Sequence, residues 1–266
     1  MSDVGVLLKQ WRRSRRLSQL ALSAEAAVSL RHLCFIETGR ARPSRVMVLR
    51  LADALDVPLR ERNALLLAAG FAPAYQESPM DAPVLTAIRR ALDAILAQQE
   101  PYPAVVMDRG WNIQHTNDAA TRLFNLLNAG HKTGPPGPPN VLRTMLHPDG
   151  VMRYVANWPE VAATLLRRIR REAVGGSTDE RAQALLAEVL AYPGMPQPPA
   201  GPDEGPQLPI IPVQFEGDGY SFTYFSTVTT LGTAQDVTLE ELRIELFHPA
   251  DQQTRHAAEA LRDTAP

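Results

Sequence analysis

The stretch Leu17 to Ser44, LSQLALSAEAAVSLRHLCFIETGRARPS, constrains the fold more than any other part of the chain. Ser18 precedes a short run rich in Ala and Leu, as an N-cap precedes a helix. Ala27-Val28-Ser29 is a turn, and Ser29 is placed to cap a second helix. That helix ends at Gly39, a residue that suits the left-handed C-cap position. The stretch therefore predicts two short helices joined by a tight turn.

The second predicted helix has an inner face and an outer face. Leu33 and Ile36 are three residues apart and are expected to face the interior. The outer positions are Leu30, Arg31, His32 and Phe35. Arg40 and Arg42 follow in a loop, where cations can meet phosphates. A helix of this kind fits the major groove of DNA, with its first residues nearest the base edges.

Three more helices are predicted around this pair. An apolar stripe at helical spacing begins at Val4, another helix begins after Ser44, and a fifth runs from about Arg60 to Ala69. Five helices within residues 1–70 predict an all-α bundle, so we place the end of the first domain there. The length of 266 residues allows about two domains.

Charge is unevenly divided between the two parts of the chain. Residues 1–70 contain 12 Lys and Arg against 6 Asp and Glu, whereas residues 71–266 contain 15 against 23. A basic first domain is typical of a module that binds a polyanion. The alternative is that the run WRRSRR forms only a solvated helix face. Taken with the two-helix pattern, the charge favours DNA binding.

Residues 7–67 resemble the helix-turn-helix regulators related to phage repressors, often called the XRE type. The resemblance is carried by Ser18-Gln19, by ETGRARPS at Glu37 to Ser44, and by LRLADALDVP at Leu49 to Pro58. It implies a phage-repressor-like fold that binds double-stranded DNA. In this family the turn usually contains Gly, whereas here it has Ala27, for which a left-handed conformation costs on the order of 1 kcal/mol.

The resemblance also implies roles for individual residues. Gln19 would hold a phosphate at the start of its helix, and the outer residues of the next helix would occupy the base-reading positions. Arg12 and Glu37 would form a buried ion pair. Together, the pattern of residues and the resemblance, which alone implies Gln19, predict a set of DNA-binding residues: Gln19, Ser29, Leu30, Arg31, His32, Phe35, Arg40 and Arg42.

A hinge and a connector helix are predicted in residues 71–100. FAPAYQESPMDAP, residues 71–83, holds three prolines and indicates a hinge. A helix with one apolar side then runs from about Pro83 to Gln99. That side is either a dimer seam or a face packed against the second domain.

An α+β domain with an antiparallel sheet of about five short strands is predicted in residues 101–250. Val105 to Met107 forms a strand, Trp111 begins a returning strand, and Asn117 caps the helix that follows. Three more strands lie in residues 210–246, with helices between the two groups. We expect helices to cover one side of the sheet. The polar tail, residues 251–266, is expected to fray from Gln252 onward.

The run VMDRGWNIQHTNDAATRLF, residues 106–124, resembles the opening of a PAS-type sensor domain. More narrowly, Pro101 to Pro249 resembles the ligand-binding domain of the MmyB-like regulators. That resemblance implies a small apolar, fatty-acid-like ligand and no other cofactor. The candidate ligand-binding residues are Trp111, Phe124, Arg143, Trp158, Phe222 and Tyr224.

Two alternatives for this domain remain open at the level of sequence. Its aromatic residues can equally belong to the core, and a ligand carboxylate can be held by Arg109, Arg143 or Arg153. The domain can also serve only as a dimerisation or protein-interaction module without a ligand. An enclosed cavity favours sensing, whereas a filled core with an exposed apolar patch favours the rival.

Other classes of protein have little support in the sequence. The chain has no GxSxG, Walker-type or HExxH motif, so we predict that it is not an enzyme. Cys34 is the one cysteine and has no partners at zinc spacing. The longest apolar run, Ala64 to Ala72, is too short to cross a membrane. With no signal peptide recognised, we expect a cytoplasmic, bacterial-type transcriptional regulator that acts as a homodimer on two half-sites.

Overall fold

The computed structural model describes residues 4–128, 137–174, 180–196, 210–217 and 219–263. These residues form two compact units. The first comprises residues 4–79 together with Gly232–Glu240, and the second contains most of the remaining described chain. Each unit is described by itself.

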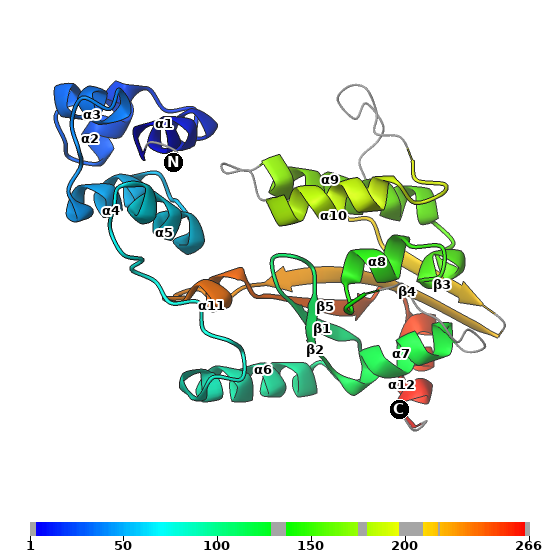
Figure 1. The fold of residues 1–266 in the computed structure, drawn as a ribbon. Coiled ribbons are helices and arrows are strands. Elements are labelled where there is room, and N and C mark those ends of the chain that lie inside the picture. The colour runs from blue at the N-terminus through cyan, green and yellow to red at the C-terminus, as the bar shows by residue number, and fades with distance from the viewer. Residues whose placement is uncertain (1–3, 129–136, 175–179, 197–209, 218, 264–266) are drawn as a thin grey trace. The chain divides into compact units, whose positions relative to one another are not determined.

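The first unit is built from helices, and the prediction of five helices in the N-terminal part is confirmed (Figure 1). In chain order these are α1 (Val4–Ser14), α2 (Gln19–Glu25), α3 (Leu30–Glu37), α4 (Arg45–Ala54) and α5 (Leu59–Ala68). Their shared core is apolar and includes the fully buried Leu8, Leu22, Leu33, Val48, Leu51 and Leu65.

Serine caps fix where three of these helices begin. The Ser18 hydroxyl accepts a hydrogen bond from the Ala21 backbone N–H at 3.0 Å. Ser29 and Ser44 cap α3 and α4 in the same way, each at 3.2 Å. Each hydroxyl satisfies one of the N–H groups that the first turn of a helix leaves without a partner. The boundaries predicted from these serines are therefore confirmed.

The turn between α2 and α3 depends on a left-handed residue. Ala27 has φ 51°, and Gly39, after α3, has φ 73°. The resemblance predicted a left-handed conformation, normally taken by glycine, at Ala27, and the positive φ of Ala27 confirms it.

A short segment from late in the sequence also belongs to the first unit. Residues 232–240 connect two strands of the second unit but include most of helix α11 (Val237–Glu241). The Glu240 carboxylate accepts a hydrogen bond from the Leu59 backbone N–H at 2.7 Å. Because Pro58 gives no side-chain cap to α5, Glu240 supplies the acceptor at the start of that helix. Asp236 accepts from the Ser78 backbone N–H at 3.2 Å.

The second unit contains one antiparallel sheet with strand order β2-β1-β5-β4-β3, which confirms the predicted five strands. The strands are β1 (Ala104–Met107), β2 (Ile113–Thr116), β3 (Val213–Gly217), β4 (Tyr220–Thr229) and β5 (Arg243–Pro249). β5 is central, because it pairs with both β1 and β4. Strands from both ends of the domain are thus joined in one sheet.

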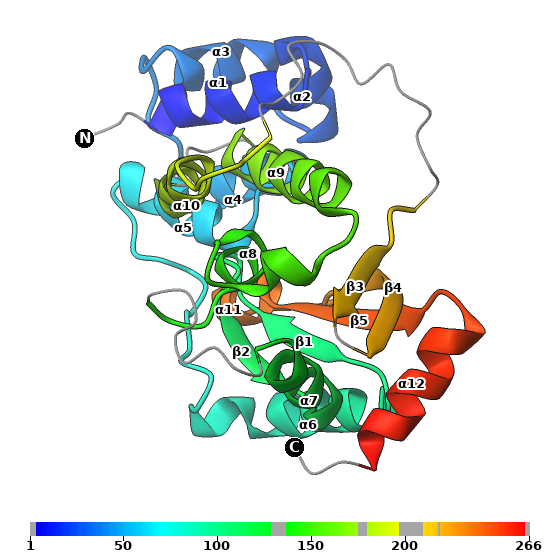
Figure 2. The same ribbon diagram turned by 90° about the vertical axis from the view of Figure 1, so that its right-hand side faces the viewer.

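Helices lie on both sides of this sheet, so the prediction of a single covered side is wrong. Figures 1 and 2 show α8, α9 and α10 on one side of the sheet and α6 on the other. The α helices of this unit are α6 (Thr86–Gln98), α7 (Asp118–Leu127), α8 (Val141–Leu146), α9 (Trp158–Val174), α10 (Glu180–Leu190) and α12 (Gln252–Arg262), with 3-10 helices at Pro83–Leu85 and Val151–Tyr154.

The connector helix α6 accounts for the second covered side. Leu92 and Leu96 are buried within the second unit, and α6 contacts β1. Of the two alternatives left open by the sequence, packing against the second domain is the one observed for this face.

The predicted fraying from Gln252 is also wrong for the described residues, which extend to 263. Residues 252–262 form α12, and Asp251 caps it by accepting from the Thr254 backbone N–H at 2.7 Å. The buried Thr254 hydroxyl accepts from the Thr223 backbone N–H at 2.8 Å. The helix packs through a few small and apolar side chains, so its composition resembles that of a solvated tail.

Candidate functional site

Helix α3 presents a mixed outer surface. Leu30 is 44% exposed and Arg31 is exposed, whereas His32 and Phe35 are half-buried. The Arg31 guanidinium carbon lies 5.3 Å from the centre of the Phe35 ring. This cation-π contact holds a positive charge beside an apolar ring on one helix face. Leu33 and Ile36 point into the core, as the spacing predicted.

Exposed cations continue beyond the end of α3. Arg40 and Arg42 are exposed in the loop between α3 and α4, and Arg45 is exposed in the first turn of α4. The Ser29 hydroxyl is engaged in capping α3. The first unit therefore combines a capped, partly exposed helix with a positive loop directly after it.

A buried ion pair supports the other side of α3, as the resemblance predicted. The Arg12 guanidinium donates to both carboxylate oxygens of Glu37, at 2.6 and 2.8 Å. Burial raises the pKa of Glu37, but hydrogen bonds from Arg12 and Gln19 outweigh it, so the pKa lies below its usual value. The pair ties α1 to the last turn of α3.

Gln19, the predicted phosphate contact, takes part in the same cluster. Its side-chain amide donates to Glu37 at 2.8 Å. An amide NH2 group has two N–H donors, and this bond uses one of them. The side chain of Gln19 is thus oriented by the buried pair.

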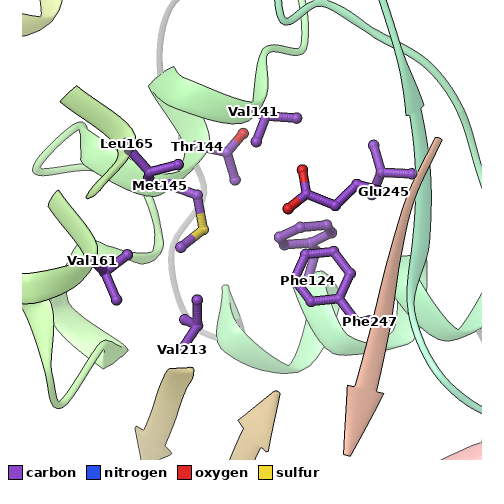
Figure 3. Close-up of a pocket in the computed structure, with 10 residues that line it drawn as sticks. Phe124, Val141, Thr144, Met145, Val161, Leu165, Val213, Glu245 and Phe247 are labelled. Carbon is purple, nitrogen blue, oxygen red and sulfur yellow. The ribbon is translucent and has the colours of Figure 1, made fainter. Parts of the chain in front are cut away.

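The second unit contains a cavity lined almost entirely by apolar side chains. The cavity is partly open, and the space within it and the solvent at its mouth together measure about 500 Å³. It is lined by residues of α7, α8, α9, β1, β3 and β5 (Figure 3). The lining residues are Val105, Phe124, Val141, Thr144, Met145, Val161, Leu165, Val213, Glu245 and Phe247. An apolar lining of this kind is typical of small-molecule sites.

Glu245 is the charged residue among those that line the cavity. Figure 3 shows its carboxylate pointing from β5 into the cavity, near Phe124. One carboxylate oxygen accepts from the Ser226 hydroxyl at 2.6 Å, and the other lies 3.5 Å from the Arg168 guanidinium. A charged acceptor therefore faces a mainly apolar space.

Arg168, which does not line the cavity, contacts Trp111 and Glu172 as well as Glu245. Its guanidinium lies 4.3 Å from the centre of the Trp111 ring and 3.8 Å from the Glu172 carboxylate. Glu172 accepts a shorter hydrogen bond, at 2.7 Å, from Arg243. Both contacts of Arg168 with carboxylates, at 3.5 Å to Glu245 and 3.8 Å to Glu172, are longer than the Arg243–Glu172 bond.

Of the six candidate ligand-binding residues, Phe124 lines the cavity. Trp111, Phe222 and Tyr224 are almost fully buried in the core of the same unit, and Trp158 packs against that core. Burial raises the pKa of the Tyr224 hydroxyl. Trp111 lies in the turn before β2, with φ 64°, so its predicted place inside the returning strand is wrong.

The predicted arginines have partners within the second unit. Arg143 donates two hydrogen bonds to Glu188, at 2.7 and 2.8 Å, and these bonds lower the pKa of Glu188 to about 2. Arg109 lies 3.6 Å from the Glu241 carboxylate, and Arg153 lies over the Tyr154 ring at 5.5 Å. A ligand that used Arg143 would have to compete with Glu188.

The cavity residues on β5 were missed because the strand was recognised only by its alternating apolar residues. Leu242, Ile244 and Leu246 indicate a strand, whereas Glu245 and Phe247 of that strand line the cavity. A signal was present, since an acidic residue stands between Ile244 and Leu246 in an apolar strand. In a sheet with helices on both sides, both alternating sets are partly buried.

The described part of the chain contains no group of three or more His, Cys, Asp or Glu side chains able to hold a metal ion. None of the described helices is long and apolar enough to cross a membrane.

A helix-turn-helix unit joined to an α+β unit with an apolar cavity defines the class of DNA-binding regulators that carry a ligand-binding domain. Residues 3–65 match a family described as helix-turn-helix domain. Residues 88–261 match the family described as MmyB-like transcription regulator ligand binding domain. The chain belongs to this MmyB-like family, which confirms both predicted resemblances; both families are regulator families rather than enzyme families.

Comparison with individual proteins adds little. No curated protein matches the chain. One solved structure, described as that of an RNA-binding light-oxygen-voltage receptor, is similar with a TM-score of 0.28 and 12% identity. The match covers 98% of this chain, which spans 60% of the length of the receptor chain. A likeness this weak carries no information about function.

Proposed function

We propose that the protein is a sequence-specific transcriptional regulator that binds DNA as a homodimer through α3. The observation that carries this proposal is the capped helix α3, locked to the core by Leu33 and Ile36 while Leu30 and Arg31 remain accessible. Arg31 and His32 contact base edges, and Leu30 or Phe35 contacts a thymine methyl. Gln19, Arg40 and Arg42 contact phosphates and so position the first unit on the DNA.

The second unit binds a small, mainly apolar ligand in the cavity next to Phe124. The apolar lining supports this proposal, because burial of a hydrocarbon ligand is favourable by about 0.8 kcal/mol for each methylene. A fatty-acid-like chain satisfies this requirement for the body of the ligand. The rival role, a protein-interaction module without a ligand, is expected with a filled core, and the cavity argues against it.

A ligand in the cavity acts on the first unit through the chain that precedes β5. Glu245 and Phe247 of β5 line the cavity, and the residues just before this strand form α11, whose Glu240 caps α5 of the first unit. A ligand that shifts β5 can therefore change the start of α5. Such control requires the ligand to favour one conformation of the first unit over another.

Native mass spectrometry of protein purified from its own host tests ligand binding. We expect a small molecule to be retained by the wild type and by Leu190→Trp, which adds an indole at an exposed position of α10. Leu165→Trp fills the cavity and should abolish retention. Retention by both variants, or by neither the wild type nor Leu190→Trp, would argue for the rival.

A further inference from the structure

The cavity carries information about the polar head of its ligand as well as about the apolar body. Nine of its ten lining residues are uncharged, and the tenth is Glu245. Glu245 is 8% exposed, so its carboxylate has little contact with bulk water. A buried carboxylate is costly unless hydrogen-bond donors or a counter-charge compensate it.

The described partners of Glu245 leave part of its hydrogen-bonding capacity unused. A carboxylate has about four acceptor sites on two oxygens. The Ser226 hydroxyl uses one at 2.6 Å, whereas Arg168 reaches the other oxygen only at 3.5 Å. Arg168 also faces Glu172 and the Trp111 ring. Glu245 can therefore accept a further donor from the cavity side.

The same geometry disfavours a ligand that carries its own carboxylate at this end of the cavity. A second carboxylate near Glu245 would place two like charges in a poorly hydrated space, where their repulsion is weakly screened. The nearest arginine on α8, Arg143, is already held by Glu188. The lining thus offers a hydrogen-bond acceptor and no positive side chain.

We propose that the cavity selects an apolar ligand with a protonated amine head, which donates hydrogen bonds to the carboxylate of Glu245. This inference rests on the proposed ligand-binding function and specifies the chemical class of the ligand. Thr144 is the other polar residue of the lining. Charge-assisted hydrogen bonds to an ionised acceptor are about twice as strong as neutral ones.

Isothermal titration of the full chain with decylamine, decanol and decanoate at neutral pH tests the proposal. The three probes have the same hydrocarbon body and differ in a cationic, a neutral and an anionic head. We expect decylamine to bind most tightly, roughly tenfold or more ahead of decanol. Decanoate should bind most weakly, because its head faces Glu245.

Two variants separate the head-group contact from a general loss of charge. Glu245→Gln keeps the shape of the side chain but removes its charge, so the preference for decylamine over decanol should disappear while decanol binding persists. Glu216→Gln removes a carboxylate from an exposed position of β3 outside the lining and should leave the preference intact. Persistence of decanol binding also shows that Glu245→Gln is folded.

The outcomes distinguish the two levels of the proposal. If decanoate binds as tightly as decylamine, or if Glu245→Gln keeps the amine preference, the head-group inference is wrong while ligand binding stands. If Leu165→Trp binds all three probes as the wild type does, they bind outside this cavity and the inference is again overturned. If none of the probes binds to the wild type, ligand binding in this cavity is itself contradicted.

Discussion

Ala27 illustrates how one residue sets the geometry of the helix-turn-helix. Its φ of 51° orients α3 relative to α2, and its methyl group is exposed. A left-handed conformation is unfavourable for any residue with a Cβ and favourable for glycine. The chain therefore holds alanine there at a cost to stability.

We predict that Ala27→Gly raises the free energy of unfolding of the first unit by about 1 kcal/mol. Hydrogen exchange of the α2 and α3 amides measures this locally, without requiring the two units to unfold together. Ala24→Gly, at an exposed position inside α2, is the matched control and should lower stability by about 1 kcal/mol. Equal effects of the two changes would contradict the role of the turn.

Glu37 gives the first unit a dependence on pH. Its pKa in the folded protein lies below the usual value of a glutamate. The ionised Glu37 therefore stabilises the folded state fully at pH values above the usual pKa of a glutamate. This stabilisation is lost as pH falls through the lower pKa that Glu37 has in the folded protein. The free energy of unfolding should therefore rise with pH across this acidic window.

Glu37→Gln should remove this pH dependence and leave the Arg12 charge without its counter-charge. We expect a loss of about 3 kcal/mol at neutral pH, as for other broken buried pairs, and a smaller loss in acid. Asp53→Asn, whose side chain is 78% exposed beside Arg62, serves as the control with a change below about 1 kcal/mol. Urea unfolding at acidic and neutral pH, monitored by hydrogen exchange of the α3 amides, distinguishes the two variants.

Among the elements, α3 and β5 differ in how well their sequences predict them. The α3 boundaries and inward side chains followed from Ser29, Gly39 and the three-residue spacing, because caps and periodicity act locally. The cavity face of β5 did not follow, because which of two alternating sets faces a cavity depends on helices far away in sequence. For the same reason most predicted pocket aromatics lie in the core.

Arg31 and Arg42 test the division of α3 and its loop into base-reading and phosphate-binding parts. Arg31→Ala should cost roughly 1–3 kcal/mol in operator binding and relax specificity at one base position. Arg42→Ala should weaken binding to all sequences alike and reduce the salt slope by about 0.9. Salt-dependent binding titrations against operator and single-base variants measure both, and uniform effects of both changes would refute the division.

Helix α5 shows how a distant segment can complete a local element. Pro58 offers no side-chain cap, and Glu240, far along the chain, accepts from the first N–H of the helix. Glu240→Ala should lower the protection of the first α5 amides against hydrogen exchange by about 1 kcal/mol. Unchanged protection would show that solvent replaces Glu240 and that α11 does not support α5.

At the scale of the whole molecule, the order of the two parts was predictable from local patterns and charge. The basic helical part and the acidic α+β part follow each other as expected, and the family of the second part agrees with the resemblance of residues 101–249. The return of residues 232–240 to the first unit was not predictable. Long-range packing of a short polar segment leaves no periodic signal in the sequence.

The central claim, sequence-specific recognition of DNA by a dimer, is tested most directly by selecting binding sites for the full chain from a pool of random duplexes. We expect enrichment of two related half-sites about one helical turn, ~34 Å, apart, occupied by two protomers. Arg31→Ala should alter the same base position in both half-sites. A pool that remains random after selection at physiological salt, while the protein is folded, would contradict the claim.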